Sequence, residues 1–199
     1  MNYIRFKEFQ NYTITYGATQ KHKKTMTQNN TNTDVILSLD AATKTGWAIY
    51  QNGKITNHGT KAFRKEPLAY YYQNWLFSMI DKYKVTKIVA EDIFRDSSHL
   101  KDKAHEVLGG LKHILISTAY TEGITPVFIN PLRVKSHLFP IFGYKRYTRA
   151  EYKQKMINRV NALGYTLEKP KADDEADAIG ILITYLDTHD IPVTHPKKN

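Results

Sequence analysis

Apolar and polar residues alternate along the chain in blocks that have the lengths of strands and helices. Short apolar runs rich in β-branched residues predict buried strands, and apolar residues three and four apart predict amphipathic helices. We therefore expect five strands, at residues 34–40, 45–50, 55–60, 86–92 and 124–130. We expect helices at residues 68–83, 103–121, 148–164 and 173–189.

Turn and cap residues support several of these boundaries. Asn52-Gly53 separates the second and third strands, and this pair favours a type I′ hairpin turn, in which both central residues need positive φ. Thr148–Glu151 has the pattern of a capping box, and Gly164 is a typical residue after a helix end. Asn130-Pro131 suits the N-cap and first position of a helix.

The predicted order is β-β-β-α-β-α-β-α-α. An antiparallel meander is followed by strands reached through crossover helices, which lie parallel to their partners. The expected fold class is α/β, with a mixed five-stranded sheet flanked by helices. If the fourth strand pairs with the first, Asp40 and Glu91 lie at the carboxyl ends of adjacent parallel strands, where open α/β sheets form their sites.

Composition divides the chain into three parts. Within residues 1–33, the segment TQKHKKTMTQNNTNT is polar and low in complexity, and cannot bury enough surface to order itself. We expect residues 1–33 to be a flexible basic arm, in which Met26 is an alternative start. Residues 34–190 are expected to form the folded domain, and residues 191–199 a basic tail.

The chain of 199 residues carries 29 Lys and Arg against 19 Asp and Glu, a formal net charge of +10 that favours a polyanionic partner such as nucleic acid. The absence of cysteine excludes disulfides, cysteine–zinc sites and thiol nucleophiles. No run reaches the ~18 apolar residues of a membrane helix, and the N-terminus lacks the apolar centre of a secretory signal. We expect a cytoplasmic protein without a membrane partner.

Within this basic chain, residues 172–180 (ADDEADAIG) concentrate four acids. Asp174 and Asp177 are three apart and share one face of a helix, on the side that Ile181 turns toward the core. Asp173 suits the N-cap, and Glu175 is explained as an acid in a first helical turn, where the macrodipole favours negative charge.

Asp40, Glu91, Asp174 and Asp177 are therefore expected to converge. Either strand-end acid alone could be a helix cap or a turn former. Together with the helical pair, they form the oxygen-rich ligand set that Mg²⁺ prefers. Two such ions can activate a water and stabilise the leaving oxygen of a phosphodiester.

The segments LSLDAATKTGWAIY, IVAEDIF and DEADAIGIL resemble, in order and separation, the three acidic segments of the RuvC Holliday junction resolvases, of the ribonuclease H-like superfamily. The resemblance covers residues 34–188. It implies a homodimer that nicks two symmetric strands of a four-way DNA junction in recombination and repair, in the cytoplasm of a bacterial or bacteriophage-infected cell.

The resemblance also implies roles for individual residues. Asp40, Glu91, Asp174 and Asp177 match the catalytic metal ligands, which would hold two Mg²⁺ ions for which Mn²⁺ can substitute. Phe94 matches an aromatic residue that the family presents to the unstacked junction centre. The chain departs from the family in having Ala41-Ala42 where Pro-Gly is usual, and Ser38 where glycine is usual, which restricts the backbone beside Asp40.

Other candidates come from position alone. Lys145 and Arg146 precede the capping box and would contact DNA phosphates near the site, or be solvated loop charges. The eight histidines show no metal-ligand spacing, and His99 and His105 are the two expected nearest the acids.

Three alternatives remain open at this stage. A hybrid-cleaving ribonuclease of the same superfamily usually has a carboxylate on its first helix, where this chain offers Asp81. An actin-like ATPase or sugar kinase needs two lobes, for which 199 residues leave little room. A DNA-junction-binding protein without catalysis would have no need of four converging carboxylates.

Overall fold

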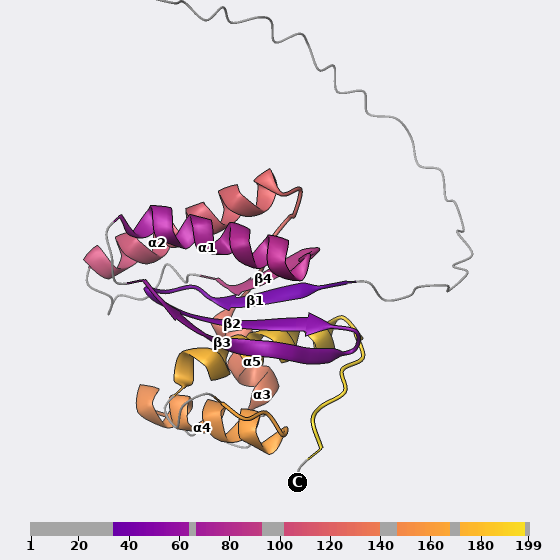
Figure 1. Ribbon diagram of the computed structural model, residues 1–199. Coiled ribbons are helices and arrows are strands. Elements are labelled where there is room, and N and C mark those ends of the chain that lie inside the picture. Colours follow the sequence, from indigo (N-terminus) through magenta and orange to yellow (C-terminus); the bar gives the residue numbers. More distant parts are fainter. Residues whose placement is uncertain (1–33, 64–66, 93–101, 140–146, 168–171, 198–199) are drawn as a thin grey trace, which may run out of the picture. The chain divides into compact units, whose positions relative to one another are not determined.

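The computed structural model describes residues 34–63, 67–92, 102–139, 147–167 and 172–197 (Figure 1). Its strands are β1 Ile36–Asp40, β2 Lys44–Gln51, β3 Lys54–Ala62, β4 Lys87–Glu91 and β5 Val127–Ile129. Its helices are α1 Leu68–Tyr83, α2 Asp102–Thr121, α3 Pro131–Leu138, α4 Arg149–Ala162 and α5 Asp173–Thr188. None of these helices is long and apolar enough to cross a membrane.

The strands form one mixed sheet in the order β3-β2-β1-β4-β5. β1 pairs antiparallel with β2 and parallel with β4, and the outer pairs β2–β3 and β4–β5 are antiparallel and parallel respectively. Helices α1 and α2 cover one face of the sheet, and α3, α4 and α5 lie on the other (Figure 1). The expected fold class, including the pairing of the first and fourth strands, is confirmed.

The predicted hairpin turn and capping box are also confirmed. Asn52 and Gly53 have φ of 53° and 76°, as the hairpin turn requires. Thr148 and Glu151 form both hydrogen bonds of the capping box. The predicted order was wrong in one respect: three helices follow the last strand rather than two. The additional helix is α3, which begins at Pro131 and is capped by the Asn130 side chain, since its Oδ1 accepts a hydrogen bond from the Leu132 N–H at 2.8 Å.

Side chains alternate between the two faces of the sheet along β1 and β4, and this alternation determines on which face Asp40 and Glu91 lie. In β1, Leu37 and Leu39 pack toward α1 and α2, whereas Ile36 packs with α5 and the Ser38 hydroxyl donates to the Ala178 carbonyl of α5 at 2.8 Å. Asp40 continues the α5 side. In β4, Val89 packs on the α5 side, so Glu91 follows it there.

Part of the expected C-terminal tail packs on the folded domain. The Tyr50 hydroxyl donates to the Pro192 carbonyl at 2.8 Å, and the Thr194 N–H donates to the Gly53 carbonyl at 2.7 Å. The segment therefore runs along the end of the sheet that carries the β2–β3 turn.

Candidate active site

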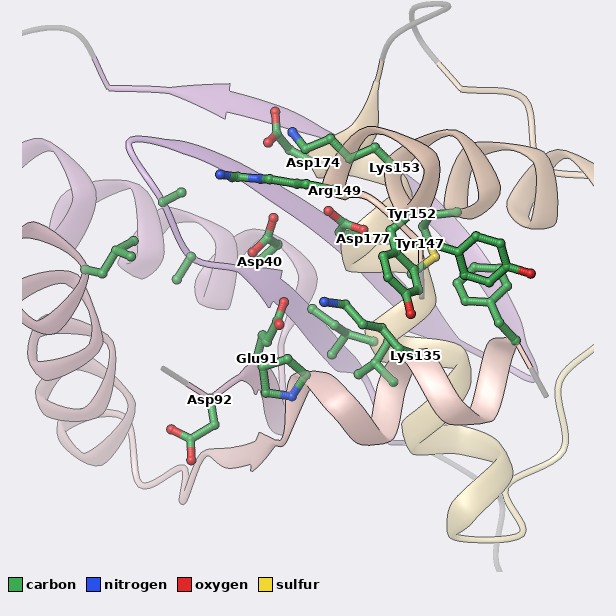
Figure 2. Close-up of a pocket in the computed structure, with 18 residues that line it drawn as sticks. Asp40, Glu91, Asp92, Lys135, Tyr147, Arg149, Tyr152, Lys153, Asp174 and Asp177 are labelled. Atoms are coloured by element: carbon green, nitrogen blue, oxygen red, sulfur yellow. The ribbon is translucent and has the colours of Figure 1, made fainter. Parts of the chain in front are cut away.

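Four acidic side chains from three elements line one pocket of about 620 Å³ (Figure 2). Asp40 ends β1, Glu91 ends the adjacent parallel strand β4, and Asp174 and Asp177 lie in the first two turns of α5. The structure thus brings together the four residues that the sequence predicted to converge. Ile181, one turn after Asp177, also lines this pocket and is buried.

The interpretation of the other two acids of the ADDEADAIG segment needs correction. Asp173 is not the N-cap: Ala172 holds that position without a side-chain cap, and Asp173 is the first helical residue and pairs with Lys153 of α4. Glu175 lies in the first turn of α5, as predicted, but its position in that turn does not explain it. It is fully buried, because the first turn of α5 rests on the sheet, and it hydrogen-bonds to His58 Nδ1 of β3 at 2.5 Å.

The acids of the pocket oppose one another's ionisation. Burial raises the pKa of Asp40 well above its usual range, and the charges of Asp177, Glu91 and Asp174 add to this effect. Burial also raises the pKa of Asp177 to about 7, with Glu91 and Asp173 contributing. The pKa of Glu91 is raised by burial against the opposing charge of Lys135.

A set of cations borders the acids. Lys44, which follows β1 on the next strand, forms an ion pair with Asp174, and Lys153 forms one with Asp173. Burial opposes the ionisation of Asp173, but the hydrogen bond from Lys153, a backbone hydrogen bond and the charges of Lys153 and Lys44 together lower the pKa of Asp173. Lys135 and Arg149 line the pocket as well, and both are directed toward it in Figure 2.

The sequence pattern did not predict that these four cations border the acids. Arg149 and Lys153 are four residues apart on α4, so their common face could be read from the spacing, but not its direction. Two tyrosines that the sequence did not predict at the site, Tyr147 and Tyr152, also line the pocket. Their rings pack edge to face, with centroids 5.4 Å apart.

The remaining candidates give no support to the site. Phe94, Lys145, Arg146 and His99, together with the expected arm 1–33, lie outside the described residues. His105 lies on α2 and is not among the residues that line the pocket. Asp92, next to Glu91, lines the pocket rim but turns away from the other acids in Figure 2 and pairs with Lys112.

The chemistry of the cluster fits a hard cation. Within the described part of the chain, Asp40, Glu91 and Asp177 form no hydrogen bond or ion pair, so buried carboxylate oxygens are left to face one another. Oxygen-only donors suit Mg²⁺ or Mn²⁺ rather than a soft metal. As they stand, no three acidic or histidine side chains among the described residues are arranged to hold an ion. The Asp174 carboxylate, turned to Lys44, would have to rotate inward.

No family model matches the chain, and no curated protein sequence does. Solved structures do match. RuvC of Thermus thermophilus, in complex with a Holliday junction substrate, is 12% identical with a TM-score of 0.57, over 79% of this chain and 97% of that one. The yeast mitochondrial Holliday junction resolvase Ydc2 is 13% identical with a TM-score of 0.57, over 77% and 78%.

A viral structure matches as well. The fowlpox virus resolvase, in complex with its substrate Holliday junction DNA, is 14% identical with a TM-score of 0.52, over 78% of this chain and 98% of that one. At these identities the likeness concerns the fold, and it covers 77–79% of this chain. The chain therefore shares its fold, a mixed five-stranded sheet flanked by helices, with these solved Holliday junction resolvases.

Proposed function

We propose that this protein is a metal-dependent endodeoxyribonuclease that resolves four-way DNA junctions. The observation that carries the proposal is the convergence of Asp40, Glu91, Asp174 and Asp177 in one pocket bordered by lysine and arginine. The fold supports it, because structural neighbours of this chain are Holliday junction resolvases, two of them solved with junction DNA. A basic chain of net charge +10 suits a polyanionic substrate.

The four carboxylates would hold two Mg²⁺ ions, for which Mn²⁺ can substitute. When bound, the ions supply an activated water and charge stabilisation at the leaving oxygen of the phosphodiester. Asp40 and Glu91 are suited to lie deepest, because pairing with Gly46 and Ile129 fixes their backbone positions within the sheet. Asp174 lies at the pocket rim, where its side chain can exchange Lys44 for an ion.

The cations would bind the DNA backbone. Arg149 and Lys153 of α4 and Lys135 of α3 line the pocket, and Lys44 of β2 forms an ion pair with Asp174. Phosphates entering the pocket would lie between these cations and the acids, which orients one phosphodiester toward the carboxylates. Lys145, Arg146 and Phe94 remain proposed DNA contacts, the last of them at the junction centre.

Two symmetric nicks require two such sites, so we further propose a homodimer. A two-fold axis would present both pockets to strands of like polarity at a junction.

The test is a substrate panel. The protein is incubated with a synthetic four-way junction, a linear duplex and an RNA–DNA hybrid, each with Mg²⁺ or with EDTA. Paired nicks in the junction, present with Mg²⁺ and absent with EDTA, are expected. Junction binding without any cutting would refute nuclease activity and favour a binding protein, and preferential cutting of the hybrid would favour a ribonuclease.

A further inference from the structure

The buried pair of Glu175 and His58 lies behind the acidic pocket. Glu175 has no exposed surface, and the His58 side chain is 18% exposed. The two residues join α5 to the edge strand β3 across 117 positions of sequence, through a contact of 2.5 Å between Oε1 and Nδ1. The contact is important because burial of the Glu175 carboxyl group without a partner would be costly.

Glu175 lies between two of the acids that the pocket brings together. An α-helix turns by about 100° per residue, so the Glu175 side chain leaves α5 in a different direction from Asp174 and from Asp177. One direction leads to the sheet, and the others lead to the pocket. Any rotation of the first turn that moves Glu175 relative to β3 must therefore also move the two pocket acids.

The first turn of α5 carries two ion pairs to partly exposed lysines, Lys153 with Asp173 and Lys44 with Asp174, but it has no side-chain N-cap to fix its orientation. Its N-cap is Ala172, which forms no side-chain hydrogen bond. His58, in contrast, is held in place by neighbouring side chains. Its ring packs edge to face on the Tyr165 ring, with centroids 6.2 Å apart. The Tyr165 hydroxyl in turn hydrogen-bonds to His195 Nδ1 at 2.9 Å. The C-terminal segment thus supports the contact that holds the helix.

We propose that His58 and Glu175 are positioning residues that fix the rotation of the first turn of α5, and thereby aim Asp174 and Asp177 for metal binding. The proposal rests on the metal site of the proposed function. Neither residue contacts the metal or the substrate. A buried hydrogen-bonded pair of this kind contributes orientation rather than stability, because well-packed apolar residues can often replace such a pair without loss of stability.

That difference gives the test. The double variant His58→Leu/Glu175→Met fills the space without a directed hydrogen bond, and we expect it to fold with a melting temperature close to the wild type. Its affinity for Mn²⁺, titrated by electron paramagnetic resonance, should fall on the order of tenfold, the loss typical when a residue that orients a metal ligand is removed. Glu175→Gln, which keeps a hydrogen-bonding oxygen, should retain most of the affinity.

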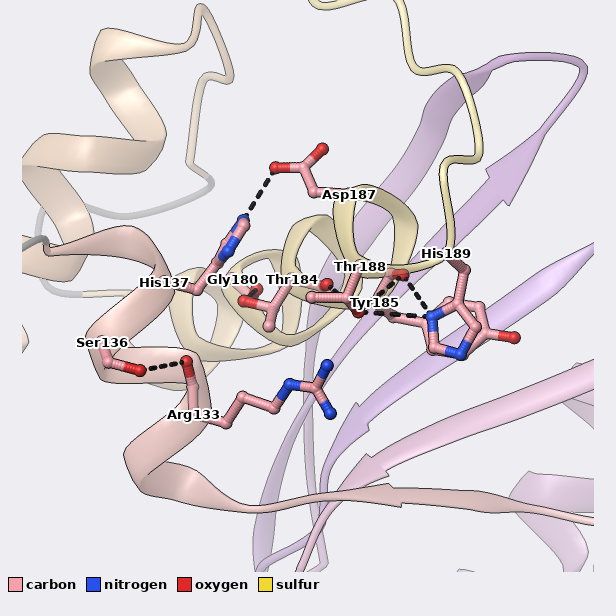
Figure 3. Close-up of polar contacts among 9 residues, drawn as sticks. All are labelled: Arg133, Ser136, His137, Gly180, Thr184, Tyr185, Asp187, Thr188 and His189. Atoms are coloured by element: carbon pink, nitrogen blue, oxygen red, sulfur yellow. Dashed lines mark hydrogen bonds and ion pairs between the residues drawn. The ribbon is translucent and has the colours of Figure 1, made fainter.

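A matched control exists on the same helix. His137 and Asp187 form a second histidine–acid pair, at 2.9 Å, near the C-terminal end of α5 (Figure 3). The variant His137→Leu/Asp187→Met should bind Mn²⁺ as the wild type does. Equal Mn²⁺ affinity of the wild type and the His58/Glu175 double variant would overturn the proposal.

Failure of the proposed function would be seen separately. If the wild type binds no Mn²⁺, the metal site itself is refuted, and amide hydrogen exchange then decides the positioning role. The double variant should exchange the amides of residues 174–177 faster than the wild type, whereas the control variant should not. Unchanged exchange in the double variant would leave no role for the pair in fixing the helix.

Discussion

Gly46 of β2 lies directly against the backbone of Asp174: a Cβ at Gly46 would stand 1.7 Å from the Asp174 carbonyl oxygen. Gly46 is also the residue that pairs with Asp40 across β1 and β2. Gly46 therefore contacts the backbone of two pocket acids: it pairs with Asp40 in the sheet, and it packs against Asp174 of α5. The separation of Asp40 and Asp174 depends on the absence of a side chain there.

The variant Gly46→Ala should disrupt this contact. Because the obstructing atoms belong to the backbone, α5 must shift away from β2, and we expect a loss of about 2 kcal/mol or more in the free energy of unfolding. In the fraction of the Gly46→Ala variant that remains folded, the affinity for the metal should also be lower than in the wild type. Gly109→Ala on α2 is the control: a Cβ there meets no atom within 4 Å, so it should stabilise the helix by about 0.5–1 kcal/mol. Urea denaturation measures both, and equal effects would contradict the account.

The pocket acids should make the metal-free protein less stable at higher pH. The pKa of Asp177 is raised from 3.8 to about 7 in the folded state, so the folded protein retains a proton that the unfolded chain has released. The contribution of Asp177 to the free energy of unfolding is therefore complete below the pKa of this residue in the unfolded chain, and it is lost as the pH rises through about 7.

We therefore expect Asp177→Asn to be more stable than the wild type at pH 8 in EDTA, by about 2–4 kcal/mol, with little difference at pH 4. Mg²⁺ should stabilise the wild type at pH 8 more than it stabilises the variant. Denaturation at the two pH values, with and without Mg²⁺, provides the measurement. An Asp177→Asn protein that is no more stable than the wild type at pH 8 would show that the acids do not repel one another as described.

Lys44 and a metal ion should compete for Asp174. The variant Lys44→Met removes the ion pair, which is worth at most about 1 kcal/mol at this exposure, so stability should change little. The affinity for Mg²⁺, measured by calorimetry, should rise several-fold. Lys84→Met breaks a more exposed Lys–Asp pair at the end of α1, with Asp81, and should leave Mg²⁺ affinity unchanged. Unchanged affinity in Lys44→Met would mean that Asp174 is not a ligand.

The convergence of the acids could be predicted because it follows from local rules. Strand ends located Asp40 and Glu91, the parallel crossover placed them side by side, and helical spacing paired Asp174 with Asp177. The same pattern could not locate the partners of the acids. The contact of Glu175 with His58 depends on the angle at which α5 crosses β3, and the pairing of Lys153 with Asp173 depends on how α4 packs on α5.

Short elements were missed for a related reason. Helix α3 has eight residues, too few for an apolar period to stand out, although its N-cap and first residue were recognisable. This helix carries Lys135 to the pocket, so the cation near Glu91 could not be expected from the sequence pattern.

Substitution of two neighbouring acids tests most directly whether this pocket cuts DNA through Asp40, Glu91, Asp174 and Asp177. Asp177→Asn and Asp173→Asn are compared for Mg²⁺-dependent cleavage of a synthetic four-way junction, with junction binding measured in EDTA. Asp177→Asn should bind the junction but lose cleavage by a factor on the order of 100 or more. Asp173→Asn, whose carboxylate pairs with Lys153, should retain most of its activity. Equal cleavage by the two variants, or normal cleavage by Asp177→Asn, would contradict the account.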